Sequence, residues 1–187
     1  MRRPLNFAMF YLGWLGCVLG AGRGLLWLGP ALACALLLAH VASMPERARE
    51  VRLILLAGVF GFALDTTLAY AGLFAFTGTS MSPWLSPPWM VALWMLFAST
   101  LNGSMSWLGG RYGVGAVLGA ICGPASYWAG ARLGAIELPD SRLWSFAGIG
   151  AAWAFAMPAL LALRDRVSGA PLRRALRRAG RAVEVAR

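Results

Sequence analysis

The chain holds a single carboxylate in the middle of a long apolar run, and the spacing of nearby glycines indicates where it points. Asp65 follows Gly61 by four residues and lies seven residues from both Gly58 and Gly72. At helical spacing these residues share one face, and small residues mark the faces on which membrane helices approach each other. A charged aspartate at the membrane midplane costs about 2.5–3.5 kcal/mol on insertion scales. We therefore predict that Asp65 faces the interior as a neutral acid that donates to a neighbour, and that it is the catalytic residue if the protein is an enzyme.

Polar side chains in other apolar runs could bind a substrate beside this carboxyl. Counted at 1.5 Å per residue, Asp65 lies about 18 Å and Tyr127 about 21 Å from the same membrane face, so that the two can share a layer with Ser99. Asn102 comes out about one helical turn from that layer, and Asn6 is more distant still. The predicted substrate-binding residues are Asn102, Tyr127, Ser99, Thr66 and Asn6. An equally open interpretation is that these groups only hydrogen-bond the helices to each other.

Several common chemistries lack their residues in this sequence. All seventeen basic side chains are arginine, so a lysine Schiff base and a Walker-A phosphate loop are both excluded. His40 is the only histidine, and Cys17, Cys34 and Cys122 lie singly in apolar runs without a CxxC pair. Such isolated cysteines are typical of small packing residues. We therefore predict no cofactor and no metal site.

The elements that must position these residues are membrane helices. Hydrophobic residues make up 59% of the 187 residues and charged residues only 13%, whereas soluble domains have roughly 25% charged residues. The sequence predicts an all-α polytopic bundle of about six transmembrane helices with glycine-rich interfaces, such as the stripe Gly115, Gly119 and Gly123. The last helix has no ionisable residue before Arg164 and is predicted to be a lipid-facing scaffold. The six apolar runs cover residues 5–22, 25–40, 53–73, 88–108, 113–133 and 143–163.

The distribution of charge predicts an orientation and argues against a nucleic-acid partner. Fourteen of the seventeen arginines fall before the first run, after the last, or in the second and fourth connections, and only Arg23, Arg132 and Arg142 fall on the other side. This asymmetry predicts a multi-pass protein of the bacterial inner membrane with both termini in the cytoplasm. Residues 1–166 form the predicted membrane domain. Residues 167–187 form a basic tail, either an amphipathic helix on anionic lipid or a merely solvated segment.

Three ordered stretches of the sequence carry a resemblance to a known family. They are Phe62 to Thr66 (FALDT), Pro88 to Phe97 (PWMVALWMLF) continuing through Leu101 to Ser104 (LNGS) and Trp107–Leu108, and Gly123 to Gly130 (GPASYWAG) with Leu133 to Ala135 (LGA). Over roughly residues 5–163 the chain resembles the bacterial inner-membrane family called domain of unknown function 2878. Genes of that family tend to sit beside cyclopropane-synthase-like and other lipid-modifying enzymes, so the resemblance implies a role in membrane-lipid or acyl-chain chemistry.

Three functions remain open at this stage. The leading hypothesis is a membrane protein that binds or helps to modify a lipid around Asp65, either as an enzyme or as a non-catalytic partner of a soluble lipid-modifying enzyme. The alternatives are a small proton-linked transporter, for which we expect a second copy of the chain as a homo-oligomer, and a structural subunit of a membrane complex. Membrane lipids are the expected partners in the leading hypothesis.

Overall fold

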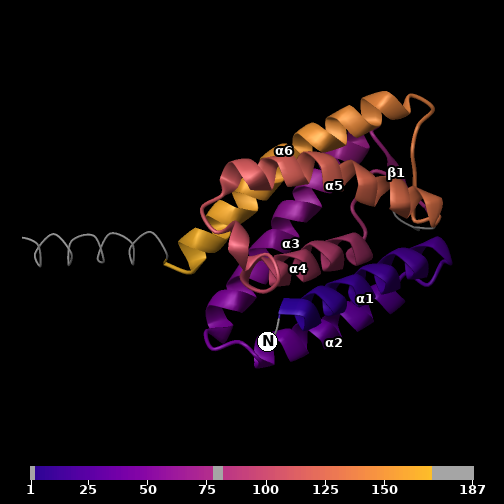
Figure 1. The fold of residues 1–187 in the computed structure, drawn as a ribbon. Helices are drawn as coiled ribbons and strands as arrows, with labels where there is room; N and C mark the ends of the chain where they lie inside the picture. The colour runs from indigo at the N-terminus through magenta and orange to yellow at the C-terminus, as the bar shows by residue number, and fades with distance from the viewer. Residues whose placement is uncertain (1–2, 78–81, 170–187) are drawn as a thin grey trace, which may run out of the picture.

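Six α-helices run back and forth through the part of the chain that the structure describes (Figure 1). The computed structural model describes residues 3–77 and 82–169, so the predicted tail lies almost wholly outside the described residues. Four of the helices, α1, α3, α5 and α6, are long and apolar enough to cross a membrane, which makes this an all-α, multi-pass architecture. The elements are α1 (Arg3–Gly22), α2 (Leu28–Ala42), α3 (Arg47–Tyr70), β1 (Ala75–Phe76), α4 (Pro88–Asn102), the 3-10 helix η1 (Ser106–Leu108), α5 (Tyr112–Arg132), β2 (Ile136–Glu137) and α6 (Arg142–Val167).

The bundle has two different ends. The described chain begins with α1 and finishes with α6 at one end, which we call the arginine-rich end (Figure 1). The opposite end, here the strand end, carries the two-residue strands β1 and β2, which pair antiparallel with Ala75 opposite Glu137 and Phe76 opposite Ile136. This pairing joins the loop after α3 to the loop after α5, a connection that hydropathy does not predict.

Helix α4 lies at the centre of the bundle, between the packed pair α1 and α2 and the packed pair α5 and α6. It packs against α1, α2, α3 and α6, whereas α5 packs mainly on α6. The glycine stripe of α5 makes that last contact possible, as the sequence predicted: a Cβ added at Gly115 would lie 2.7 Å from Leu161, and one at Gly123 would lie 2.5 Å from Trp153. The prediction that α6 is a lipid-facing scaffold describes only one face of the helix, which carries the exposed Phe155. Trp153 and Met157 of α6 point inward because the α5 glycines leave room for them.

Helix α4 ends six residues before the end of its apolar run because side chains from other helices terminate it. The last carbonyls of a helix need outside donors. The Asn6 amide of α1 donates to the Ser99 carbonyl at 3.3 Å, and the Arg164 guanidinium of α6 donates to the Leu101 carbonyl at 3.2 Å. The Asn6 carbonyl oxygen also accepts the backbone N–H of Ser104 at 2.8 Å, and Gly103 leaves the space that the Asn6 side chain fills.

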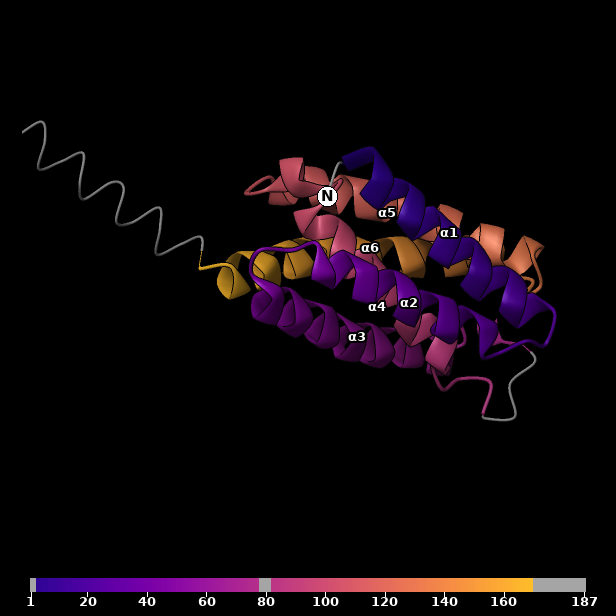
Figure 2. The ribbon, with the colours of Figure 1, turned by 90° about the horizontal axis from the view of Figure 1, so that it is seen from below.

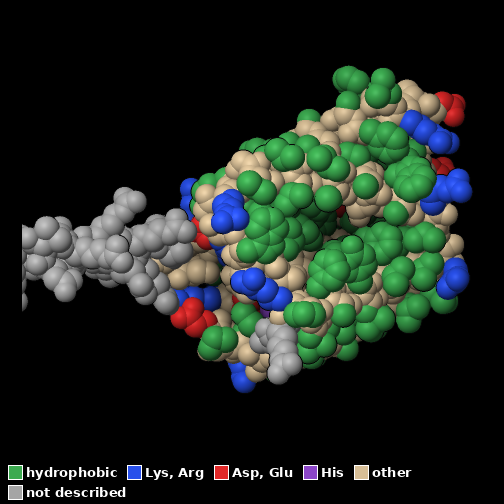
Figure 3. All heavy atoms as spheres, in the orientation of Figure 1, with side chains coloured by type: hydrophobic (Ala, Val, Ile, Leu, Met, Phe, Trp, Pro, Cys, Tyr) green, Lys and Arg blue, Asp and Glu red, His purple; other side chains and the backbone are tan. Residues whose placement is uncertain are grey.

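The outer surface of the bundle is largely apolar (Figure 3). Large hydrophobic side chains such as Leu38, Val59, Val117 and Phe155 are more than half exposed, as expected of helices that face lipid. Helices α2 and α4 have 15 residues each, about 22 Å, which is shorter than a hydrocarbon core of about 30 Å. Turns follow α2, and a turn and the 3-10 helix η1 follow α4.

Candidate functional site

Asp65 forms the centre of a buried hydrogen-bonded group that joins three helices. Its side chain on α3 is completely buried. The indole N–H of Trp94 on α4 donates to one carboxyl oxygen at 2.7 Å, and the hydroxyl of Tyr127 on α5 donates to the other. Gly61, one turn before Asp65, provides the room for the Trp94 ring, because a Cβ there would overlap it. The sequence prediction that the glycine face of α3 aims Asp65 inward agrees with this geometry.

The two donors limit where a proton on Asp65 can lie. An indole N–H only donates, so the carboxyl oxygen facing Trp94 must accept. A proton on a neutral Asp65 therefore has to lie on the oxygen that faces Tyr127, and the tyrosine hydroxyl, which can donate or accept, would then turn its own hydrogen elsewhere. Among the described residues, Tyr127 is thus the hydrogen-bond partner with which this carboxyl can exchange a proton.

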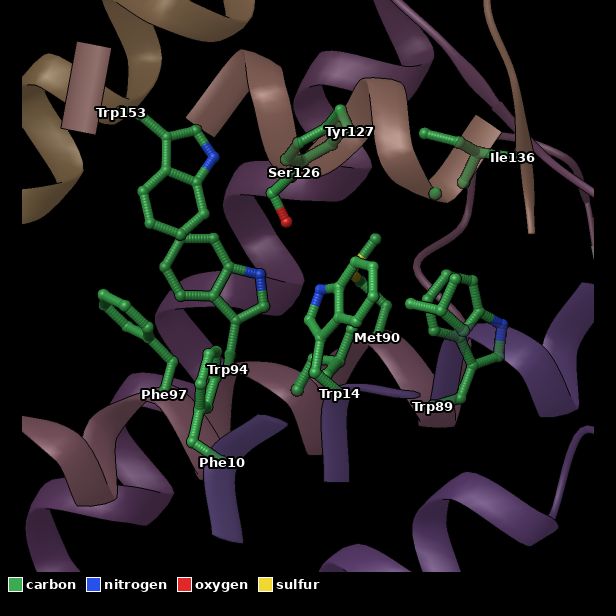
Figure 4. Close-up of a pocket in the computed structure, with 13 residues that line it drawn as sticks. Phe10, Trp14, Trp89, Met90, Trp94, Phe97, Ser126, Tyr127, Ile136 and Trp153 are labelled. Atoms are coloured by element: carbon green, nitrogen blue, oxygen red, sulfur yellow. The ribbon is translucent and has the colours of Figure 1, made fainter. Parts of the chain in front are cut away.

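A small cavity lies beside Tyr127 (Figure 4). Its volume is about 60 Å³, and Tyr127 and Ser126 line it, whereas Asp65 does not. The Ser126 hydroxyl points into it, and the Trp153 indole nitrogen lies on the side of its ring that faces Tyr127 (Figure 4). Four tryptophans from α1, α4 and α6 form much of the wall: Trp14, Trp89, Trp94 and Trp153.

The size and lining of the cavity restrict what can occupy it. An engineered cavity that holds benzene measures about 150 Å³, so 60 Å³ admits a few waters or a slim hydrocarbon segment but not a ring. Trp94 and Trp153 stack with ring centroids 4.7 Å apart and planes 15° apart, which gives one wall a flat aromatic face. The Trp153 N–H is directed toward the Tyr127 hydroxyl but is not hydrogen-bonded to it. A ligand in this cavity would therefore meet Tyr127 and Trp94, and Asp65 would act on it through these two side chains.

A larger groove on the side of the bundle adjoins this cavity. It has a volume of about 600 Å³, lies between α1 and α5, and shares Phe10, Trp14, Phe97, Ser126 and Trp153 with the cavity wall. The space-filling view shows the hollow, surrounded by hydrophobic side chains (Figure 3). Ser104 and Trp107 line the groove as well, close to the arginine-rich end. The groove and the cavity are thus adjacent, and side chains from the same helices separate the arginine-rich end of the groove from Tyr127.

A family model described as "Protein of unknown function (DUF2878)" matches residues 3–159. The chain belongs to this family. The matched residues include Asp65, Trp94, Tyr127 and Trp153, so the hydrogen-bonded group and the cavity both lie within the family's shared region. No curated protein and no solved structure matches the chain.

Of the site residues predicted from the sequence, the structure brings together only Asp65 and Tyr127. Tyr127 contacts Asp65, but the other four serve elsewhere. The Ser99 hydroxyl donates to the Leu96 carbonyl within α4 at 2.7 Å, and Thr66 accepts the backbone N–H of Ser86 at 3.2 Å. Asn6 terminates α4, as described above. The fourth, Asn102, belongs to a second polar cluster.

That second cluster contains two buried residues that the sequence analysis missed. Glu50 is 3% exposed and His40 is 1% exposed, and the His40 Nε2 lies 2.8 Å from one Glu50 carboxyl oxygen. The Asn102 amide donates to the other oxygen at 2.8 Å. Glu50 was overlooked because α3 begins at Arg47, six residues before its apolar run. The sequence did contain a signal for this cluster, since His40 lies near the end of one helix and Glu50 near the start of the next.

The sequence analysis also did not predict two tryptophans of the site, Trp94 and Trp153. Trp94 and Trp153 lie in apolar runs, where an indole is as consistent with packing as with hydrogen bonding, so sequence alone does not distinguish them. Among the described residues, no group of three or more histidine, cysteine, aspartate or glutamate side chains could hold a metal ion.

Proposed function

We propose that this DUF2878 protein binds an acyl chain of a membrane lipid in the α1–α5 groove and brings part of that chain to Tyr127. The observation that carries the proposal is the wall that the lateral groove shares with the tryptophan-lined cavity, whose lining includes a tyrosine held by a buried aspartate. A groove that opens sideways on a membrane helix bundle is reached from the hydrocarbon layer.

The lining supports an acyl chain over other ligands. No charged side chain lines the groove or the cavity within the described residues, so neither offers a partner to a phosphate or an ammonium group. The narrow cavity excludes rings, whereas a polymethylene chain is slim and apolar. The hydroxyls of Ser126 and Tyr127 are among the few polar groups of this lining, beside the indole N–H groups of its tryptophans.

The orientation of the bundle adds a direction to this proposal. The arginine-rich end faces the cytoplasm in our proposal, because basic residues favour that side of a bacterial inner membrane. The mouth of the groove near Ser104 and Trp107 then lies in the cytoplasmic leaflet. A chain held there could be acted on by the protein itself or by a soluble lipid-modifying enzyme that approaches from the cytoplasm.

In either case Tyr127 is the residue that touches the ligand, and Asp65 is a positioning residue. Asp65 and Trp94 fix the rotamer and the hydrogen-bond direction of the tyrosine hydroxyl from behind. The proton on that hydroxyl can be directed toward Asp65 or toward the cavity, so the pair can hold or release a proton at the Tyr127 oxygen.

A variant that fills the groove tests the proposal directly. Ala125 is exposed and lines the groove, so Ala125→Trp should block a chain without disturbing the buried core. Val117 is 59% exposed on the same helix and does not line the groove, so Val117→Trp is the matched control. We expect the membrane acyl-chain profile of a deletion strain to be restored by the wild type and by Val117→Trp but not by Ala125→Trp. Full restoration by Ala125→Trp at equal protein abundance would overturn the proposal.

Two further measurements separate an enzyme from a presenting partner. An enzyme should change the lipid profile when expressed without its neighbouring enzymes. A presenting partner should change nothing alone and should copurify with a soluble lipid-modifying enzyme.

A further inference from the structure

A second lateral groove lies on the other side of α4, between α2 and α3. It has a volume of about 580 Å³ and is lined by apolar side chains and by the hydroxyl-bearing residue Ser86. We propose that this α2–α3 groove is a separate binding site for an ester-linked phospholipid of the leaflet at the strand end, with the Ser86 hydroxyl donating to the ester carbonyl of the lipid.

The shape of the groove fits a chain that enters from the side. Helices α2 and α3 make few contacts with each other, and α4 forms the floor between them through Val91 and Met95. Leu38, Leu55 and Phe62 line the groove and are 67%, 53% and 40% exposed, so the opening faces the lipid-exposed surface.

The second polar cluster joins the helices around the groove at the arginine-rich end. The His40–Glu50 contact at 2.8 Å ties the end of α2 to the start of α3, and Asn102 ties Glu50 to the end of α4. None of these three residues lines the groove. A lipid can therefore extend its chain toward this end but has its polar part at the strand end, where Ser86 lies.

Ser86 supplies the observation that points to a ligand. Its residue is 3% exposed, and its hydroxyl oxygen is buried without a hydrogen-bond partner in the described part of the chain. The backbone N–H of Ser86 is already used, since it donates to Thr66. Buried hydroxyls are normally paired, so a lone one lining a groove indicates an acceptor supplied from outside the chain.

The position of Ser86 favours an ester carbonyl as that acceptor. Ser86 comes two residues before the start of α4 at Pro88, at the edge of the helical bundle rather than in its middle. Ester carbonyls lie at the same boundary in a phospholipid and accept hydrogen bonds, whereas the chains below them do not. No charged side chain of the described residues lines the groove, so the headgroup itself must remain outside.

Two native cysteines allow both grooves to be followed in one molecule. Cys34 lines the α2–α3 groove and Cys122 lines the α1–α5 groove, and both are exposed free thiols, whereas Cys17 is completely buried. Purified full-length protein in detergent would be titrated with dioleoyl phosphatidylcholine or with its ether-linked analogue. The rate of N-ethylmaleimide addition at each cysteine would then be read by peptide mass spectrometry.

We expect the ester lipid to protect Cys34 at a concentration about 3- to 10-fold lower than the ether lipid, the range expected for one hydrogen bond. Ser86→Ala should remove this difference while leaving the protection of Cys122 unchanged. Ser104→Ala, which removes a hydroxyl from the other groove, should leave Cys34 unaffected. Ser86→Ala should also fold with an unchanged or slightly higher melting temperature, because its hydroxyl has no partner among the described residues.

Equal protection of Cys34 by the two lipids, or an ester preference that survives in Ser86→Ala, would overturn the assignment of Ser86. Absence of any protection at Cys34 would overturn the site itself. These outcomes are independent of the proposed function, because the α1–α5 groove is reported by Cys122 alone.

Discussion

Replacement of Asp65 tests the hydrogen-bonded group on which the proposed function depends. In Asp65→Leu both donors to the carboxyl, the Trp94 indole and the Tyr127 hydroxyl, lose their acceptor. In Asp65→Asn the amide oxygen must face Trp94, which only donates, and the amide nitrogen must then donate to Tyr127. Asn therefore keeps both contacts but reverses the hydrogen bond at the tyrosine.

The two substitutions should differ measurably in stability. Each buried donor left without an acceptor costs about 1–3 kcal/mol, so Asp65→Leu should lose about 2–6 kcal/mol of unfolding free energy. Hydrogen bonds inside membrane proteins average nearer 0.6 kcal/mol, which sets a lower bound of about 1 kcal/mol for the pair. We expect Asp65→Asn to unfold close to the wild type and well above Asp65→Leu. Ser99→Ala is the matched control, because its buried hydroxyl donates only within its own helix and should change little.

Denaturant unfolding of the purified variants in detergent gives the stabilities, and the membrane lipid profile gives the function. The reversed hydrogen bond in Asp65→Asn should abolish the lipid phenotype at normal protein abundance, since the Tyr127 hydroxyl can no longer pass a proton to position 65. Equal stability of Asp65→Leu and Asp65→Asn would refute the energetic argument. Full activity of Asp65→Asn would refute the functional one, and Asp65 would then serve only to join the helices.

Three further predictions concern packing, the second cluster and topology. Gly119→Ala should destabilise the protein by about 1–3 kcal/mol, because its Cβ would overlap the Trp153 backbone, whereas Gly113→Ala meets nothing within 4 Å and should be neutral or slightly stabilising in the same unfolding assay. Glu50→Ala should lower the unfolding free energy by about 3–5 kcal/mol, because it leaves His40 unpaired. Arg49→Ala removes the exposed Arg49–Glu46 ion pair and should lower it by less than about 1 kcal/mol, so that similar losses in the two variants would contradict the buried cluster. A reporter fused after Arg187 should be active only as a cytoplasmic reporter, and activity on the periplasmic side would reject an even number of spans.

The parts of this structure that depend on local patterns could be predicted from the sequence. Apolar runs predicted six helices, and the spacing of Gly115, Gly119 and Gly123 predicted the face on which α5 is packed, because both signals lie within a single helix. The end of α4 could not be predicted, since Asn6 and Arg164 terminate it from helices distant in the sequence.

The candidate site could likewise be predicted only in part, where the signal lies within a single helix. Asp65 and Tyr127 were placed together because helical rise gives the depth of a residue along its own helix. The helical rise does not tell which neighbouring helix a side chain faces. Ser99 has a similar predicted depth, but its hydroxyl donates to a carbonyl within α4 instead. Trp94 was missed because the residue that makes room for it is Gly61 on another helix.

The hydrogen bonds of Asp65 also join the helices that border the two grooves. Asp65 lies on α3, Trp94 on α4 and Tyr127 on α5, so the group joins the helix bordering the α2–α3 groove to the helix bordering the α1–α5 groove. On α4, Trp94 lines the cavity while Val91 and Met95 form the floor of the α2–α3 groove. The cavity and the α2–α3 groove are therefore lined by neighbouring residues of one stretch of α4. A chain that displaces Tyr127 must break or bend its bond to Asp65, and Asp65 then retains only Trp94.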